Sequence, residues 1–217
     1  MVSLQSRHVR HVATERNNMN TTITTEIIGE AENRSLKVTL GDDIFYLPFK
    51  LIAGKWVGFL DISGQFILNE CAADFLVDIF EKKGLEFDTI VNPVSKSNAL
   101  AHAIAVRWAK KHPELTHTVV ARKSSDPSNP VQATYKSVTT ASMQTLALTA
   151  DDAAFIKGKK VLLVDDVFGG GGTTKALREL MDRAGAEVAV HAVIGVEEGA
   201  NFPEDLVYLF TLPVLDK

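Results

Sequence analysis

Two adjacent carboxylates, Asp165 and Asp166, lie just before four consecutive glycines in the stretch VLLVDDVFGGGGTTKALREL (161–180). Glycines at a strand-to-helix turn leave backbone N–H groups free to converge on an anion, and the dipole of the following helix adds a favourable potential. At about 4 Å and an effective dielectric near 20, a carboxylate repels a like charge by about 4 kcal/mol. The acids therefore suit hydroxyl groups or a metal ion elsewhere on the same ligand. A sugar phosphate meets both demands.

Thr173 and Thr174 follow the glycines and can either donate hydroxyl hydrogen bonds to a phosphate or cap the helix. The spacing excludes two other glycine-rich loops. A nucleotide P-loop, G-x-x-x-x-G-K-S/T, needs a glycine where Thr174 stands when counted from Gly169. The dinucleotide fingerprint needs a glycine at the same place, and its acid lies about 20 residues downstream rather than just upstream.

The elements around the acid pair are a buried strand and an amphipathic helix. Val161 to Val164 form an apolar run that is too short for a helix and does not alternate, which indicates a strand covered on both faces, as in a parallel sheet. Apolar residues then recur at helical spacing from Ala176 until Gly185, which predicts the end of the helix. The acids and glycines thus follow the carboxyl end of a strand, where open α/β sheets bind ligands.

Strands and helices alternate along most of the chain. Apolar periodicity predicts helices over 68–84 and 98–113, strands over 87–91, 116–123, 187–196 and 206–210, and a loop over 124–132. TYKSVTT and TLALTA can pair as a flexible hairpin. This order predicts an α/β fold with an open, mainly parallel sheet and helices on both faces.

The N-terminal part has a different pattern. LKVTL and IFYLPF, separated by GDD, predict an antiparallel β-hairpin. Residues 1–25 are polar and lack either period, so we expect a disordered leader, within which Met19 is an alternative start. The predicted organisation is a single domain over 26–217, with a hairpin and hood contribution from 26–60 and a core over 66–196.

The composition of the chain bears on which partners it can bind and in which compartment it works. The 217 residues favour one core, and no apolar run is long enough to cross a membrane. A net charge of -4 gives no electrostatic reason to expect a nucleic-acid or lipid partner. The lone cysteine, Cys71, and the lack of a secretory-type N-terminus favour the cytoplasm. We therefore expect no nucleic acid and no membrane among the partners.

The order of buried strand, Asp165-Asp166, a short apolar pair and Gly171-Gly172-Thr173 resembles the phosphoribosyl-pyrophosphate (PRPP) motif of type I phosphoribosyltransferases. ARKSSDPSNP through TYKSVTTASMQTLALTADDAAFIKGKKV resembles the strand, mobile catalytic loop and return strand of adenine and xanthine phosphoribosyltransferases. NPVSKSNALAHAIA is similar to their pyrophosphate-binding loop and the helix after it. The resemblance covers roughly residues 45–196.

The resemblance implies a role for each matched position. Asp165 and Asp166 would hold the ribose hydroxyls and the magnesium environment, with Mg²⁺ held mostly by PRPP itself. The 5-phosphate would lie in the loop formed by Gly169, Gly170, Gly171, Gly172, Thr173 and Thr174. Pyrophosphate would contact Ser95, Lys96 and Ser97, and the base would approach Val167 and Phe168.

Two further lysines are candidates for phosphate contacts. Lys123 ends a predicted strand and would bind pyrophosphate, and Lys136 lies in the mobile-loop segment as a catalytic candidate. The alternative for both is a solvated surface lysine. They could also act across a homodimer, the assembly that we expect.

Three positions depart from the family pattern. Gly169 stands where hypoxanthine-guanine enzymes carry an aspartate directed at the base. The TYKSVTT segment lacks the glutamate of the adenine enzymes, and Gly170 replaces a common threonine, which removes one hydroxyl donor worth about 1 kcal/mol. The backbone cradle is unaffected, but the identity of the nucleobase stays open.

The resemblance implies Mg²⁺-dependent transfer of a phosphoribosyl group from PRPP to a nucleobase, such as the purines adenine or xanthine, with release of pyrophosphate. The alternative is a protein that senses PRPP without turnover, as some relatives do. A phosphoacceptor receiver domain also opens with a strand like VLLVDD, but the 51 residues after Asp166 are too few to complete one.

Overall fold

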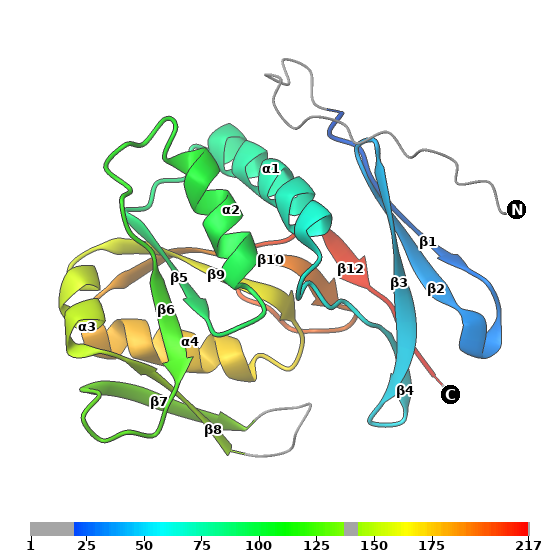
Figure 1. The fold of residues 1–217 in the computed structure, drawn as a ribbon. Helices are drawn as coiled ribbons and strands as arrows, with labels where there is room; N and C mark the ends of the chain where they lie inside the picture. The colour runs from blue at the N-terminus through cyan, green and yellow to red at the C-terminus, as the bar shows by residue number, and fades with distance from the viewer. Residues whose placement is uncertain (1–19, 137–142, 217) are drawn as a thin grey trace, which may run out of the picture.

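The computed structural model describes residues 20–136 and 143–216, which form two sheets and the helices packed against them (Figure 1). The smaller sheet has the order β1 (Ile23–Ile28), β2 (Ser35–Leu40), β3 (Asp43–Ile52), β4 (Lys55–Gly58) and β13 (Val214–Leu215), and a short 3-10 helix, Ala31–Asn33, joins β1 to β2. The larger sheet has the order β11 (Leu206–Val207), β10 (Glu187–Glu197), β9 (Lys160–Phe168), β5 (Thr89–Pro93), β6 (Val119–Lys123), β8 (Met143–Leu148) and β7 (Val131–Lys136), with β12 (Phe210–Leu212) also paired to β10.

The larger sheet is mainly parallel, as predicted. β6, β5, β9 and β10 pair in parallel, and both β11 and β12 add to β10 in the same sense. The antiparallel part is β8, which pairs with β6 and β7. The β7–β8 pair confirms the hairpin predicted from TYKSVTT and TLALTA; its connection, 137–142, lies outside the described residues.

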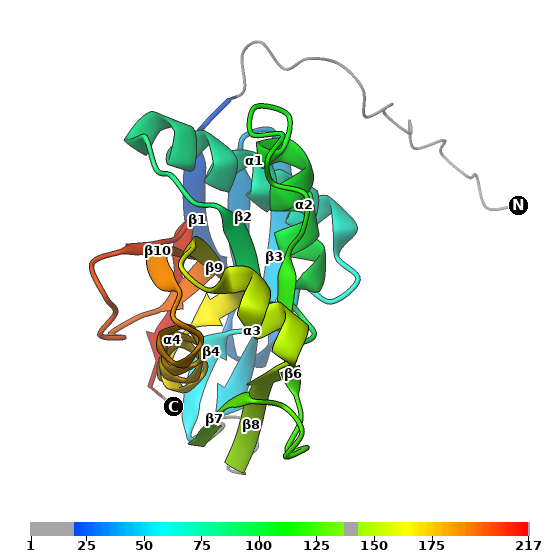
Figure 2. The same ribbon diagram turned by 90° about the vertical axis from the view of Figure 1, so that its left-hand side faces the viewer.

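Helices cover both faces of this sheet, which confirms the predicted fold class (Figure 1 and Figure 2). α1 (Phe66–Lys83) and α2 (Asn98–Trp108) pack on one face, and α3 (Ala150–Ile156) and α4 (Gly172–Ala184) pack on the other. The central position of β9 in the sheet explains why the run from Val161 to Val164 is apolar throughout and does not alternate with polar residues. Its residues Leu162 and Val164 join the core under α1 and α2, whereas Val161 and Leu163 join the core under α4.

Helix α3 was not predicted from the sequence. It has seven residues, which is too short for helical periodicity to be recognised. Its start is nevertheless encoded locally: the Thr149 hydroxyl accepts a hydrogen bond from the Asp152 backbone N–H at 3.1 Å. This is an N-cap with the acid in the first turn, where the helix dipole favours it.

The predicted N-terminal hairpin is confirmed as β2 and β3, which pair antiparallel and turn at Gly41 with φ of 62°. Alternate residues of β2, Leu36, Val38 and Leu40, are buried in the core shared with α1, and Figure 1 shows this sheet standing beside that helix. The leader boundary was wrong: β1 begins at Ile23, inside the stretch 1–25 predicted as disordered. Residues 1–19, with Met19, lie outside the described residues.

The topology brings four strand ends to one edge of the sheet. β5, β6, β9 and β10 all run parallel, so their carboxyl ends at Pro93, Lys123, Phe168 and Glu197 lie on the same side. The loops that follow these ends carry most of the polar residues singled out by the sequence. In the described part of the chain, none of the helices combines the length and apolar composition needed to span a membrane.

His191 is fully buried in the middle of β10. Neither ring nitrogen has a hydrogen-bond partner within residues 20–136 and 143–216, and the ring meets Phe168 edge-on at 6.3 Å between centroids. Burial, followed by the charge of Arg178, lowers the pKa of His191 to about 4, against a smaller opposing effect of Asp205. Because the unfolded chain binds this proton at higher pH, the folded state loses stability as pH falls from about 6.5 towards 4.

We therefore expect His191→Leu to reduce the acid sensitivity of the fold. Between pH 7 and pH 4, the wild-type free energy of unfolding should fall by about 2–3 kcal/mol more than that of the variant. Urea titrations of both proteins at several pH values measure this difference. Equal pH dependence in the two proteins would contradict the neutral, buried state assigned to this histidine.

Candidate active site

A cleft of about 340 Å³ lies at the carboxyl ends of β5, β6, β9 and β10. Its volume is within the range of small-molecule sites. The structure brings most of the predicted site residues together here. The cleft is lined by Ser95, Lys96, Lys123, Asp165, Asp166, Val167, Gly169, Gly170, Gly171, Gly172, Thr173 and Thr174, together with Ile52, Val57, Gly58, Phe59, Leu60, Pro93, Val94, Tyr135, Glu197 and Leu212.

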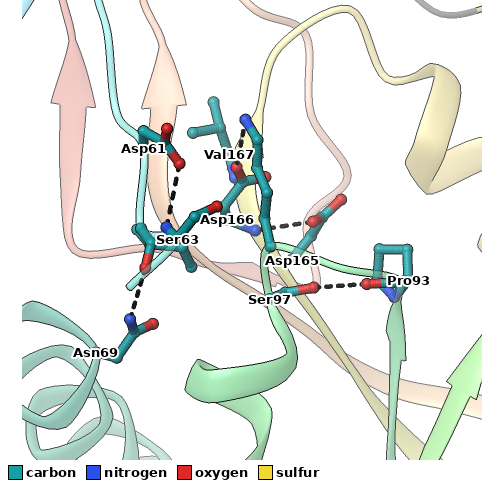
Figure 3. Close-up of polar contacts among 10 residues, drawn as sticks. Asp61, Ser63, Asn69, Pro93, Ser97, Asp165, Asp166 and Val167 are labelled. Atoms are coloured by element: carbon teal, nitrogen blue, oxygen red, sulfur yellow. Dashed lines mark hydrogen bonds and ion pairs between the residues drawn. The ribbon is translucent and has the colours of Figure 1, made fainter. Parts of the chain in front are cut away.

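Asp165 and Asp166 both line the cleft, and Figure 3 shows the hydrogen bonds that their carboxylates accept. Asp165 is buried, and its Oδ1 accepts the Asp166 backbone N–H at 2.9 Å; Asp166 Oδ1 accepts the Val167 N–H at the same distance. Burial, and next the neighbouring Asp166 carboxylate, raise the pKa of Asp165 well above its usual value. A ligand that donates hydroxyl hydrogen bonds or brings a cation would stabilise the ionised pair.

The glycine run forms the turn from β9 into α4. Gly171 has φ of 72°, a left-handed conformation that residues with a Cβ adopt only with strain, and it precedes the first helical residue, Gly172. The first N–H groups of a helix have no partners within the helix, so this end of α4 presents donors and a positive dipole end to the cleft. Thr174, buried in the first turn, adds a hydroxyl at the same place.

The loop between β5 and α2 carries a lysine to the acid pair. Lys96 Nζ lies 3.4 Å from Asp166 Oδ2 and 5.7 Å from the centroid of the Phe59 ring. Ser95 also lines the cleft, and the peptide bond before it is cis. Ser97 behaves differently from the prediction: its hydroxyl is fully buried and donates to the Pro93 carbonyl at 3.0 Å, as Figure 3 shows. Its side chain secures the loop and does not line the cleft.

The two other lysines predicted at the site differ in position. Lys123, the last residue of β6, lines the cleft and is exposed. Lys136 is the last residue of β7, and its side chain lies outside the described part of the structure. Tyr135, the residue before it, reaches the cleft and was not singled out from the sequence.

The predicted pair of base contacts is divided by strand geometry. Val167 lines the cleft, but Phe168 is buried on the other face of β9 against Val193, Val196 and Leu206. Successive side chains of a strand point to opposite faces, so two neighbours cannot both contact one ligand. The prediction that Phe168 contacts a base is therefore wrong for this structure.

One end of the cleft has a mainly apolar lining, although the ammonium groups of Lys50 and Lys96 lie 3.6 and 5.7 Å from the centroid of the Phe59 ring. Ile52, Val57 and Phe59 reach it from the N-terminal sheet, and Leu212 reaches it from β12. Glu197, the last residue of β10, lies there half-buried, and burial raises its pKa. The sequence analysis missed this residue, although a signal was present: Glu197 follows the apolar strand predicted over 187–196, much as Asp165 follows its own.

No group of three or more histidine, cysteine or carboxylate side chains is arranged to hold a metal ion among the residues described. Asp165 and Asp166 lie beside the glycine loop, and Glu197 lines the same cleft. Two oxygen-donor side chains suit Mg²⁺ that keeps substrate phosphates and water as its other ligands. The pair therefore fits a metal ion that enters with its substrate.

Residues 67–214 match the sequence pattern of the phosphoribosyl transferase domain family. The match spans more than half of the chain and contains the acid pair, the glycine loop and the lysine loop. The chain belongs to the phosphoribosyl transferase domain family.

Curated members of this family align with parts of the chain. An adenine phosphoribosyltransferase of Petrotoga mobilis is 36% identical over 105 residues, 48% of this chain and 56% of that protein. An adenine phosphoribosyltransferase of Thermosipho melanesiensis is 29% identical over 148 residues, 64% and 75% of the two chains. The purine biosynthesis transcriptional repressor of Bacillus subtilis is 25% identical over 191 residues, 86% of this chain and 63% of the repressor. The first of these matches thus spans little more than half of the relative's length.

Solved structures of phosphoribosyltransferases share the fold. The adenine phosphoribosyltransferase of Giardia lamblia in complex with 9-deazaadenine superposes with a TM-score of 0.55 at 15% identity, covering 86% of this chain and 93% of that one. The adenine phosphoribosyltransferase of Rhodothermus marinus gives 0.51 at 23% identity, covering 64% and 77%. At these identities the likeness establishes the type I phosphoribosyltransferase fold.

The acid pair of this family motif gives a testable prediction for the ligand-free protein. Asp165→Asn removes a buried charge beside Asp166 while keeping an oxygen that can accept the Asp166 N–H. We expect the melting temperature at pH 7 to rise by a few degrees, as a stabilisation of about 1 kcal/mol would produce. Differential scanning calorimetry measures the change. A lower melting temperature would contradict the conclusion that burial and the Asp166 carboxylate make ionised Asp165 unfavourable.

Proposed function

We propose that this chain transfers the phosphoribosyl group of PRPP to a purine base and releases pyrophosphate, with Mg²⁺ bound chiefly to PRPP. The observation that carries the proposal is the lining of one cleft: an acid pair, a glycine loop at a helix N-terminus and a lysine-bearing loop. The acid pair suits the ribose hydroxyls, the glycine loop suits the 5-phosphate, and the lysine-bearing loop suits the pyrophosphate. The adenine phosphoribosyltransferase relatives support the same activity.

The positions of the three parts suggest how PRPP would lie. Its 5-phosphate would accept hydrogen bonds from the backbone at Gly169–Thr174, where the α4 dipole favours negative charge. The ribose hydroxyls would donate to Asp165 and Asp166. The Lys96 ammonium group lies 3.4 Å from the Asp166 carboxylate, and it would also interact with the pyrophosphate when PRPP binds. As the bond to the anomeric carbon breaks, this cation would offset the negative charge that develops on the leaving group.

Mg²⁺ on the pyrophosphate would supply further neutralisation of the leaving group. Asp165 and Asp166 would hold the ion mostly through water and the ribose hydroxyls.

The base would lie in the apolar end of the cleft, beside the ribose. Phe59, Val167 and Leu212 line this end and suit a flat heterocycle. A purine is favoured because adenine phosphoribosyltransferases match the chain. Adenine is the first base to test, followed by xanthine.

A protein that binds PRPP without turnover is the second candidate. The Bacillus subtilis repressor aligns with 86% of this chain, more than either adenine phosphoribosyltransferase described above. The two candidates share the PRPP site and differ in whether a base is consumed.

A cytoplasmic homodimer is part of the proposal. Cys71 is the single cysteine of the sequence and cannot form an internal disulfide, which accords with a reducing compartment. Light scattering of the purified protein measures its oligomeric state.

The activity is tested by mixing the protein with Mg²⁺, PRPP and each common nucleobase in turn and following pyrophosphate release. We expect turnover with at least one purine and a large loss of rate when Mg²⁺ is chelated. PRPP binding without consumption of any base would instead support the non-catalytic candidate.

The ligand assignment is tested with the double variant Asp165→Asn, Asp166→Asn. Loss of two charge-assisted hydrogen bonds of about 1.5–3 kcal/mol each should weaken PRPP binding at least about a hundredfold in calorimetric titrations. The chain offers a matched control in Asp42 and Asp43, a second adjacent pair at the β2–β3 turn. Asn at both of those positions removes the same charge and should leave the affinity unchanged. Undiminished PRPP binding by the cleft variant would overturn the site assignment.

A further inference from the structure

Glu197 and Gly169 meet at the boundary between the phosphate loop and the apolar end of the cleft. A Cβ atom placed on Gly169 would lie 2.5 Å from Oε2 and 2.9 Å from Oε1 of Glu197. A methyl group at position 169 would therefore require the Glu197 carboxylate to shift. The φ angle of Gly169 is not in the left-handed region, so space rather than backbone conformation explains a glycine here.

The Glu197 carboxylate has no hydrogen-bond or ion-pair partner within residues 20–136 and 143–216. By contrast, the adjacent Glu198 accepts the Val214 backbone N–H at 3.1 Å through Oε2 and is exposed. An acceptor that is half-buried in a cleft and unpaired is one that a ligand can engage without breaking a protein contact. Leu212, which pairs with Glu197 between β12 and β10, has no polar side-chain group to offer this carboxylate.

The position of Glu197 matches a chemical need of the proposed reaction. A purine that forms an N-glycosidic bond begins with an N–H on its five-membered ring and must lose that proton. With the ribose on Asp165 and Asp166, a base in the apolar end lies next to the carboxylate that covers Gly169. Burial raises the pKa of Glu197, which makes the carboxylate a better proton acceptor near neutrality.

We infer that Glu197 is the group that takes the proton of the nucleobase, an assignment that rests on the proposed function. The bond from the ring nitrogen to the anomeric carbon forms as the bond from that carbon to the pyrophosphate oxygen breaks. The electron pair of the broken bond leaves with pyrophosphate, and the N–H proton moves to the Glu197 carboxylate, which becomes neutral.

The test compares steady-state kinetics of Glu197→Gln with the wild type, using PRPP, Mg²⁺ and the base that the wild type consumes. Glutamine keeps the size and an acceptor oxygen but is not a useful base. We expect kcat to fall about 10²–10⁴-fold, with KM for PRPP changed by less than about threefold. Glu198→Gln is the matched control, because it removes a carboxylate at the neighbouring position, and its kcat should equal that of the wild type.

Gly169→Ala tests the geometry without removing the acid. The added methyl would push the carboxylate away, so kcat should fall in the wild-type background. In a Glu197→Ala background this clash is absent, and the same substitution should lower kcat by a smaller factor than it does in the wild-type background. Sodium formate, which can enter the space left by the Glu197 side chain as a free carboxylate, should restore part of the activity of Glu197→Ala.

The outcomes separate this assignment from the proposed function. If the wild type turns over and Glu197→Gln retains kcat within about threefold, the role of Glu197 is overturned and the transferase activity stands. Additive losses for Gly169→Ala and Glu197→Ala would overturn it as well. A wild type that binds PRPP but consumes no base overturns both proposals together. Melting temperatures establish that each variant is folded.

Discussion

The structure of the cleft depends on keeping two like charges together at the end of a buried strand. Asp165 lies at the edge of a low-dielectric core beside Asp166, and this burial raises its pKa. Backbone N–H groups and Lys96 offset part of the repulsion. Within residues 20–136 and 143–216, no single group donates hydrogen bonds to both carboxylates. Hydroxyl donors or a cation would stabilise the ionised pair.

Strand geometry decides which residues join that pair. β9 is covered on both faces until Asp165, and beyond it one face opens to the cleft while the other stays in the core. Val167 and Phe168 therefore have different environments although they are neighbours in sequence. β10 pairs with β9 up to Val196 and Phe168, so the next residue of each strand, Glu197 and Gly169, meet at the same depth. A register shift of one residue would move the Glu197 side chain to the opposite face.

The family match and the particular residues of this chain bear on different parts of the cleft. The family match covers the acid pair, the glycine loop and the lysine loop. The apolar end of the cleft is assembled from the N-terminal sheet, β9, β10 and β12. Most of these elements lie outside the short motif at Asp165–Thr174, so the motif by itself does not determine which side chains line that end.

The sequence by itself determined the α/β class, the β2–β3 hairpin, the ends of α1 and α4, and the position of the acid pair and glycine loop. These features depend on local patterns: apolar periodicity, a glycine that ends a helix, and adjacent residues in one loop. The sequence analysis misplaced the side chains of Phe168 and Ser97, missed the short helix α3, and did not reveal Glu197 or the apolar end of the cleft. Those features depend on which face of a strand a residue occupies and on contacts between segments far apart in the chain. Only the tertiary structure brings Gly169 and Glu197 together, because their contact arises from the pairing of two parallel strands joined through a whole helix.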